Sequence, residues 1–101
     1  MDIKNLYKQA QQMQTKMQKV QGDLDNEMVK GESGGGAIAI HSNCKGDIKK
    51  VEINKDLIDL EEDIEILEDL ILAALNDAKK KAENTASKKM SEAGLPNNLM
   101  A

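Results

Sequence analysis

The sequence predicts an α+β protein with the element order helix–strand–strand–strand–helix. Apolar residues follow a heptad spacing near the N-terminus, and a second long helical pattern fills most of the C-terminal half. Three short strand-like runs lie between these two patterns, separated by turn residues. The turns are short, so the strands are expected to form a small antiparallel sheet. At 101 residues the chain is long enough for one domain with a modest core.

The first helix is expected to begin after Asp2 and to end near Asn26. Asp2 is suited to cap this helix, because its carboxylate can accept hydrogen bonds from the first free N–H groups. The apolar residues recur at alternating spacings of three and four, as in a coiled-coil seam. This seam consists of Ile3, Leu6, Ala10, Met13, Met17, Val20 and Leu24.

Three strand candidates follow, at residues 28–33, 37–42 and 48–54. The glycine-rich stretch "GESGGG" separates the first two candidates, and "NCKGD" separates the last two. The glycines fit neither a P-loop, which needs a Lys-Ser/Thr pair, nor a dinucleotide fingerprint, so they are interpreted as a hairpin turn. Ile48 is out of phase with Val51 and Ile53, which indicates a bulge or an early strand end.

The second helical pattern runs from Asp59 to Ala93. Asp59 and Glu62 form a variant of the capping box at its start, and Gly94 followed by a proline is suited to stop it. Its first half is rich in bulky aliphatic residues, whereas its second half carries small residues at every fourth position. This alanine stripe consists of Ala74, Ala78, Ala82, Ala86 and Met90.

The two helices are expected to pack against each other in antiparallel directions. Val20 and Leu24 would then meet Leu67 and Ile71 near the sheet. The N-terminal half of the seam would lie over the alanine stripe, and both helices would project together as one arm.

The domain is expected to comprise residues 1–94, with residues 95–101 as a disordered tail. No apolar run approaches the roughly 20 residues of a membrane span, and no signal peptide is recognisable. A cytoplasmic protein without membrane association is therefore expected. The single cysteine, Cys44, agrees with a reducing compartment.

The composition argues against an enzyme. The chain has one Tyr and neither Trp nor Phe, which suits aliphatic helix packing better than a deep enzyme pocket. The sequence shows no nucleophile–base pair and no metal-ligand cluster, and His41 is interpreted as structural. No cofactor, metal or small-molecule substrate is expected.

The formal charge of −4 hides an uneven distribution of sign. Residues 1–22 hold four lysines and one carboxylate, and residues 78–101 hold five lysines and two carboxylates. Residues 57–77 hold eight carboxylates and no lysine. Both outer segments of the chain are therefore basic. All basic residues are lysines, which contact phosphate as point charges and do not read sequence through it.

Four segments together resemble the YbaB/EbfC family of bacterial nucleoid-associated DNA-binding proteins. The segments are "LYKQAQQMQTKMQKVQ", "VKGESGGGAIAI", "KKVEINKDLI" and "LEDLILAALNDAKKKAE", in this order and spacing. The resemblance covers nearly the whole chain. It implies an α-β-β-β-α protomer that dimerises through its sheet and projects helical arms like tweezers.

The resemblance also implies a function. Such a protein binds double-stranded DNA, alters its conformation, and acts in nucleoid organisation and gene regulation. Family regions combined with local charge give the candidate DNA contacts Lys4, Lys8, Lys16, Lys19, Lys79, Lys80, Lys81, Lys88 and Lys89. Gln9 and Gln12 could add contacts to base edges, although glutamine-rich helix faces are also common in solvent.

Two function classes stay open at this stage. The first is a DNA-binding architectural protein located in the cytoplasm, on the nucleoid. The second is a protein-interaction clamp that uses its helical arms without binding DNA. A homodimer is expected, because three short strands form a sheet of marginal stability and because the family implies one.

Overall fold

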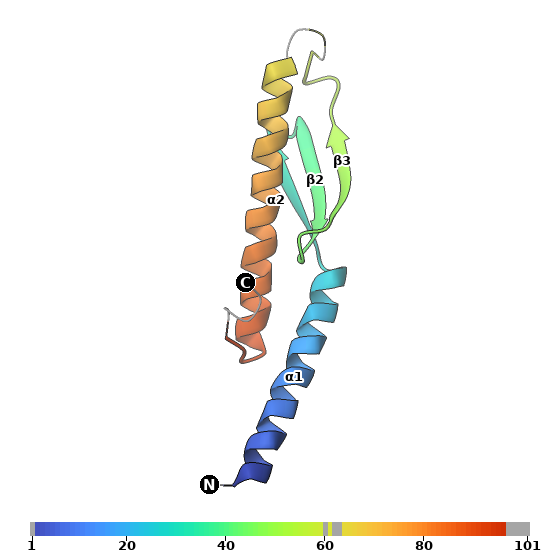
Figure 1. Ribbon diagram of the computed structural model, residues 1–101. Coiled ribbons are helices and arrows are strands. Elements are labelled where there is room, and N and C mark those ends of the chain that lie inside the picture. The colour runs from blue at the N-terminus through green and yellow to red at the C-terminus, as the bar shows by residue number, and fades with distance from the viewer. Residues whose placement is uncertain (1, 60, 62–63, 97–101) are drawn as a thin grey trace.

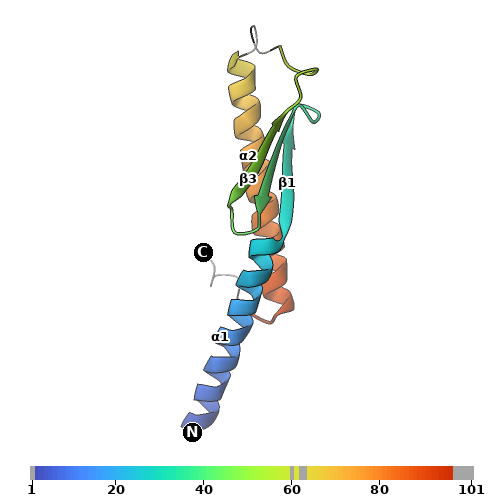
Figure 2. The same cartoon turned by 90° about the vertical axis from the view of Figure 1, so that its right-hand side faces the viewer.

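The computed structural model describes residues 2–59, 61 and 64–96. It contains α1 (Ile3–Asn26), β1 (Met28–Ser33), β2 (Ile38–Asn43), β3 (Ile48–Ile53) and α2 (Ile64–Glu92). The predicted fold class and element order are confirmed. The molecule is elongated, 69 × 19 × 16 Å, because the N-terminal part of α1 extends past the end of α2 (Figures 1 and 2).

Asp2 caps α1 as the sequence predicted. Its Oδ1 accepts hydrogen bonds from the backbone N–H of Lys4 at 3.1 Å and of Asn5 at 3.4 Å. At the other end the Glu27 N–H donates to the Asp23 carbonyl, and Glu27 is extended, so the chain passes directly into β1. The predicted boundaries of the first helix are therefore confirmed.

The strands form an antiparallel sheet in the order β1-β2-β3. Gly34, Gly35 and Gly36 have φ angles of 62°, 67° and 93°, which glycine adopts without steric cost, so the glycine stretch is the predicted hairpin turn. Ser42 pairs with Ile48 while His41 pairs with Lys50, and this shift confirms the predicted irregularity near Ile48.

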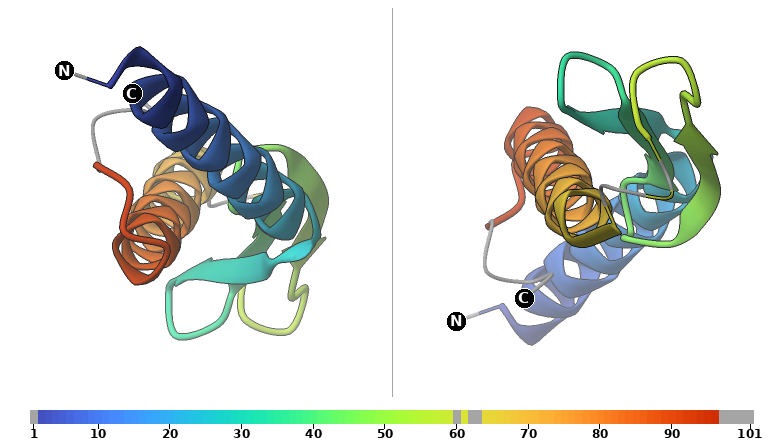
Figure 3. Two further views of the ribbon diagram at one scale, coloured as in Figure 1. Left: turned by 90° about the horizontal axis from the view of Figure 1, so that it is seen from below. Right: turned by 90° about the horizontal axis from the view of Figure 1, so that it is seen from above.

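The second helix packs along one side of the sheet (Figure 3). Its closest approach is at Gly31 of β1. A Cβ atom at this position would lie 2.7 Å from the Ala78 Cβ and closer still to backbone atoms of Ala74 and Ala78. Only glycine therefore allows this contact. Ala74 and Ala78 are buried here together with Ile38 and Ile40 of β2.

The two helices run in opposite directions as expected, but the expected contacts between them are wrong (Figure 1). The sheet has an odd number of strands, so the chain enters it at one end and leaves it at the other, and α2 begins far from α1 (Figure 1). Val20 and Leu24 consequently pack against Met90 and Leu95 at the end of α2, not against Leu67 and Ile71. The first part of the alanine stripe faces β1.

The N-terminal half of the seam has no partner among the described residues. Ile3 is 77% exposed and Met13 is 46% exposed. The projecting arm is therefore a single helix. We define the α1 arm as residues 3–16, over which every residue is exposed.

Helix α2 ends in a Schellman motif. Gly94 has a φ angle of 72°, its N–H donates to the Ser91 carbonyl, and the Leu95 N–H donates to the Met90 carbonyl. Leu95 was predicted to begin the disordered tail but is only 6% exposed, because it packs in the cluster that holds Val20 and Leu24.

Two predictions concern positions outside the described residues. These positions are Glu62 of the predicted capping box and residues 97–101 of the predicted tail. Asp59 accepts a hydrogen bond from the Glu61 N–H at 3.0 Å, and the first described residue of α2 is Ile64.

The contact at Gly31 predicts a large effect of a single methyl group. Gly31→Ala should lower the free energy of unfolding by about 3 kcal/mol or more, because the added Cβ meets helix backbone that cannot yield. Urea unfolding followed by circular dichroism measures this loss. Gly22→Ala is the control, since nothing lies within 4 Å of its added Cβ; it should stabilise the protein by up to about 1 kcal/mol. An unchanged stability of Gly31→Ala would contradict the described contact.

Candidate nucleic-acid interface

The α1 arm concentrates positive charge. Residues 3–22 contain four lysines and no carboxylate. Helical spacing of about 100° per residue places Lys4 and Lys8 on the face of α1 opposite Val20 and Leu24. These lysines therefore point away from the body of the protein, and no acidic side chain interrupts them along the helix.

The described part of the most acidic segment lies at the other end of the molecule. Between residues 56 and 69 the chain carries eight carboxylates and no lysine. The described part of this segment, the loop after β3 and the first turns of α2, lies at the end of the sheet farthest from the start of α1 (Figure 1). The Debye length is about 8 Å at physiological salt, so these carboxylates do not cancel the field of the α1 arm.

Gln12 lies among the lysines of α1, whereas Gln9 does not. A shallow surface hollow of about 650 Å³ is lined by Lys8, Gln11, Gln12, Thr15 and Lys16. Of the two predicted base-reading glutamines, Gln12 therefore shares a surface with the predicted phosphate contacts. Gln9 is exposed on the same helix but does not line this hollow.

The structure brings Lys89 of α2 beside α1. Lys16, Lys19 and Lys89 line one hollow of about 400 Å³ together with Asp23 and Glu92. Lys89 also forms an ion pair of 3.8 Å with Glu27. This surface is consequently of mixed charge, unlike the α1 arm.

The three consecutive lysines of α2 do not form one patch. Successive residues on a helix point about 100° apart, so Lys79, Lys80 and Lys81 face three directions. Lys79 lines a groove beside the β2–β3 turn. Lys81 reaches the opposite side of α2, where its Nζ donates to the Lys30 carbonyl at 2.9 Å. These residues lie alongside the sheet. They were expected to lie on the projecting arm.

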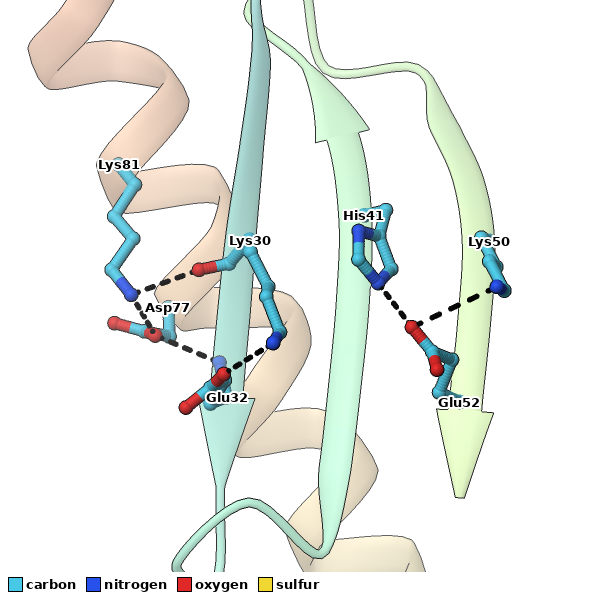
Figure 4. A network of polar contacts seen from close by, with 7 residues as sticks. All are labelled: Lys30, Glu32, His41, Lys50, Glu52, Asp77 and Lys81. Atoms are coloured by element: carbon cyan, nitrogen blue, oxygen red, sulfur yellow. Dashed lines mark hydrogen bonds and ion pairs between the residues drawn. The ribbon is translucent and has the colours of Figure 1, made fainter. Parts of the chain in front are cut away.

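Lys81 belongs to a polar network that covers the outer edge of β1 (Figure 4). The Lys81 ammonium forms an ion pair of 3.0 Å with Asp77, and Asp77 accepts a hydrogen bond of 2.9 Å from the Glu32 N–H. The backbone donor of Glu32 and the backbone acceptor of Lys30 are thus satisfied by side chains of α2. An edge strand with satisfied backbone groups offers no template for further pairing.

The network shifts the pKa of its members. The hydrogen bond from the Glu32 backbone, followed by that from Lys81, lowers the pKa of Asp77 below its ordinary value. The Lys30–Glu32 hydrogen bond and ion pair, 2.9 Å long, raise the pKa of Lys30 and lower that of Glu32.

A second pair lies on the neighbouring strands. The hydrogen bond from His41, followed by the charge of Lys50, lowers the pKa of Glu52 (Figure 4). His41 therefore contacts a side chain of the neighbouring strand.

Sequence reasoning missed the role of Asp77. Its spacing of four from Lys81 signals a helix-surface ion pair. The same spacing gives no sign that both side chains reach a strand about 45 residues earlier in the chain.

An exposed apolar surface lies beside α2. Val51 and Ile53 of β3 pair with Ile40 and Ile38 of β2, and therefore point to the same face of the sheet as the buried core. Helix α2 covers β1 and β2 on this face but leaves β3 open. Val51 is 51% exposed, and Leu72 of α2 is 59% exposed. A groove of about 670 Å³ between α2 and the β2–β3 turn continues this surface.

Comparisons with known proteins agree with the fold and point to DNA. The model of the YbaB/EbfC DNA-binding family matches residues 1–95. A nucleoid-associated protein of Legionella pneumophila (strain Corby) is 48% identical over 103 residues, which cover 98% of this chain and 90% of the relative. A nucleoid-associated protein of Clostridium novyi (strain NT) is 46% identical over 90 residues, covering 89% and 78%.

One solved structure shows the same fold. The crystal structure of an uncharacterized protein from Helicobacter pylori matches with a TM-score of 0.78 at 23% identity, covering 91% of this chain and 96% of the other. Among the described residues, no helix combines the length and apolar character needed to cross a membrane.

The lowered pKa of Asp77 predicts how its contribution to stability depends on pH. An ionised Asp77 stabilises the fold at neutral pH, and this contribution is lost as the pH falls from the ordinary value of 3.8 through the lowered pKa. Asp77→Asn should therefore have a lower free energy of unfolding than the native protein at neutral pH, and the difference between the two should disappear in acid. Urea unfolding of both proteins over a pH series measures this difference.

The matched control is Glu68→Gln, which removes an exposed carboxylate from the same helix. Its free energy of unfolding should stay close to that of the native protein throughout the pH series. A difference between Asp77→Asn and the native protein that stays constant down to about pH 2 would contradict the role given to Asp77.

Proposed function

The chain belongs to the YbaB/EbfC DNA-binding family, and we propose that it is a nucleoid-associated protein that binds double-stranded DNA through the α1 arm. The family description and the names of the relatives support DNA as the partner. The observation that carries the choice of surface is the lysine-bearing, carboxylate-free helix that projects from the body. The proposal assigns no catalytic step to the protein.

The dimensions of the α1 arm fit a DNA groove. An α-helix with its side chains is about 10–12 Å across, and the major groove of B-DNA is about 12 Å wide. Because residues 3–16 are exposed on all sides, the arm can enter such a groove with phosphates on both flanks. Two helices packed together, as the sequence analysis expected, would be too wide.

Lysines on the arm would then lie close to the phosphates. Each lysine that neutralises a phosphate releases a counterion, so the affinity depends strongly on salt. Lys4, Lys8, Lys16 and Lys19 are the proposed primary contacts. Binding through phosphates positions the protein without reading sequence, which suits an architectural role.

The lysines of α2 are proposed as secondary contacts to DNA. Lys81 and Lys89 already form ion pairs with Asp77 and Glu27, and DNA would have to compete with these carboxylates. Lys79, Lys80 and Lys88 complete this set.

We also propose that the protein forms a homodimer through the exposed apolar surface of β3 and α2. Ile48, Val51 and Ile53 lie side by side on the open part of the sheet, and Leu75 of α2 lines a groove together with Ile48. A second copy of the same surface would remove these side chains from water. The dimer would carry two α1 arms, which could hold one duplex between them and change its path.

The cellular role follows from the family and from this geometry. We propose that the protein resides in the cytoplasm on the nucleoid, where it organises DNA and influences gene expression. The relatives that carry the name nucleoid-associated protein support this location.

Removing the four lysines of α1 should lower the salt dependence of DNA binding. In a mobility-shift titration of duplex DNA, the logarithm of the affinity should fall linearly with the logarithm of the salt concentration. The combined variant Lys4→Gln, Lys8→Gln, Lys16→Gln and Lys19→Gln should bind more weakly. Its slope should be smaller by about 0.9 for each phosphate that the variant no longer neutralises.

A charge-matched control separates the site from the net charge. The combined variant Lys30→Gln, Lys49→Gln, Lys50→Gln and Lys55→Gln removes the same number of charges from the sheet region. It should keep nearly the native slope. Equal losses of affinity in both variants would show that total charge, and not the α1 arm, determines binding.

The proposed dimer interface can be broken at one residue. Val51→Glu places a carboxylate in the apolar surface, which should raise the dissociation constant of the dimer by about two orders of magnitude or more. Static light scattering at micromolar concentration should then report a monomer. Lys50→Glu introduces the same carboxylate on the opposite face of β3 and should leave the dimer intact. A native protein that is monomeric in this measurement would refute the interface.

A further inference from the structure

The tip of the α1 arm carries apolar side chains that the fold does not use. Tyr7 is 66% exposed, and Ile3, one turn before it, is exposed as well. Tyr7 is also the only aromatic residue of the chain. It lies off the seam that leads to Val20 and Leu24, so packing of α1 against the body does not account for its position.

The surroundings of Tyr7 favour a nucleic acid over another protein. On the helix surface Tyr7 neighbours Lys4 at a spacing of three and Gln11 at a spacing of four, and Lys8 follows it directly. No carboxylate occurs from residue 3 to residue 22. Asp2 precedes this region, and its carboxylate is held against the helix end by the N–H groups of Lys4 and Asn5.

When a basic helix lies in the major groove, an apolar side chain on it can contact one apolar group on the base edges, the C5-methyl group of thymine. The edges of the other bases present donors and acceptors there, whereas thymine presents its C5-methyl group. A side chain that enters the groove between two lysines bound to phosphate is well placed to cover this methyl group.

We propose that Tyr7, together with Ile3, contacts thymine methyl groups in the groove that the α1 arm enters. This inference rests on the proposed function and adds a base contact to it. The lysines supply the salt-dependent part of the affinity, and Tyr7 supplies a part that depends on the bases. The protein therefore prefers thymine-containing duplexes although it has no arginine to read guanine.

The test compares two duplexes that differ only in the methyl group. One is a duplex of alternating A·T pairs, and in the other deoxyuridine replaces every thymidine. The native protein should bind the deoxyuridine duplex about fourfold more weakly for each methyl group that it covers. Tyr7→Ala should show a smaller difference between the two duplexes, and the double variant Ile3→Ala, Tyr7→Ala should bind both equally, which also corrects for any difference in duplex stiffness.

Two further variants sharpen the test. Tyr7→Phe keeps the ring and should keep the preference for thymine. Asn5→Ala changes an exposed polar residue of the same helical turn and should keep it as well. Circular dichroism of Tyr7→Ala should match that of the native protein, because the side chain is exposed.

The fluorescence of Tyr7 provides an independent readout. As the only aromatic residue, it reports on the arm tip alone, and its emission should be quenched when duplex DNA is added. Equal affinity of the native protein for the two duplexes would overturn the inference, as would an undiminished preference in Tyr7→Ala. In either case salt-dependent binding to both duplexes would leave the proposed function intact, whereas failure to bind either duplex would overturn both.

Discussion

The close contact between Gly31 and α2 determines where the remaining parts of the protein lie. The absence of a side chain at Gly31 lets the backbone of β1 approach Ala74 and Ala78 directly. This approach also brings Asp77 and Lys81 within reach of the outer edge of β1, where they satisfy its backbone groups. Helix α2 therefore packs on β1 and β2, and the apolar side chains of β3 stay exposed.

The same packing of α2 on the sheet leaves α1 without a partner over most of its length. The first turns of α2 pack on the sheet, so only its last turns meet α1, through Met90 against Val20 and Leu24. The remainder of α1 projects as a single basic helix. The surface proposed for a second copy of the chain and the surface proposed for DNA thus lie on different elements. Dimerisation and DNA binding therefore need not compete for the same side chains.

The sequence was sufficient to predict the helices, strands and turns, but not which helix face packs against which strand or helix. Asp2, Gly34 to Gly36 and Gly94 act locally through backbone geometry, so the turns and caps could be predicted from their neighbours alone. The heptad seam of α1 and the alanine stripe of α2 showed which faces are apolar. Periodicity does not show which face meets which, and here the stripe packs on Gly31.

The candidate site was predictable to a similar extent. The basic part of α1 could be recognised from composition, because residues 3–22 hold four lysines and no carboxylate and stay basic in any packing. The lysine run of α2 was misleading, because residues adjacent in sequence diverge on a helix and Lys81 is drawn to β1. Hydrogen exchange with and without duplex DNA would show directly whether DNA binds to the α1 arm. We expect DNA to slow amide exchange in residues 3–16; protection confined to the sheet and to α2, with none in these residues, would contradict binding through the arm.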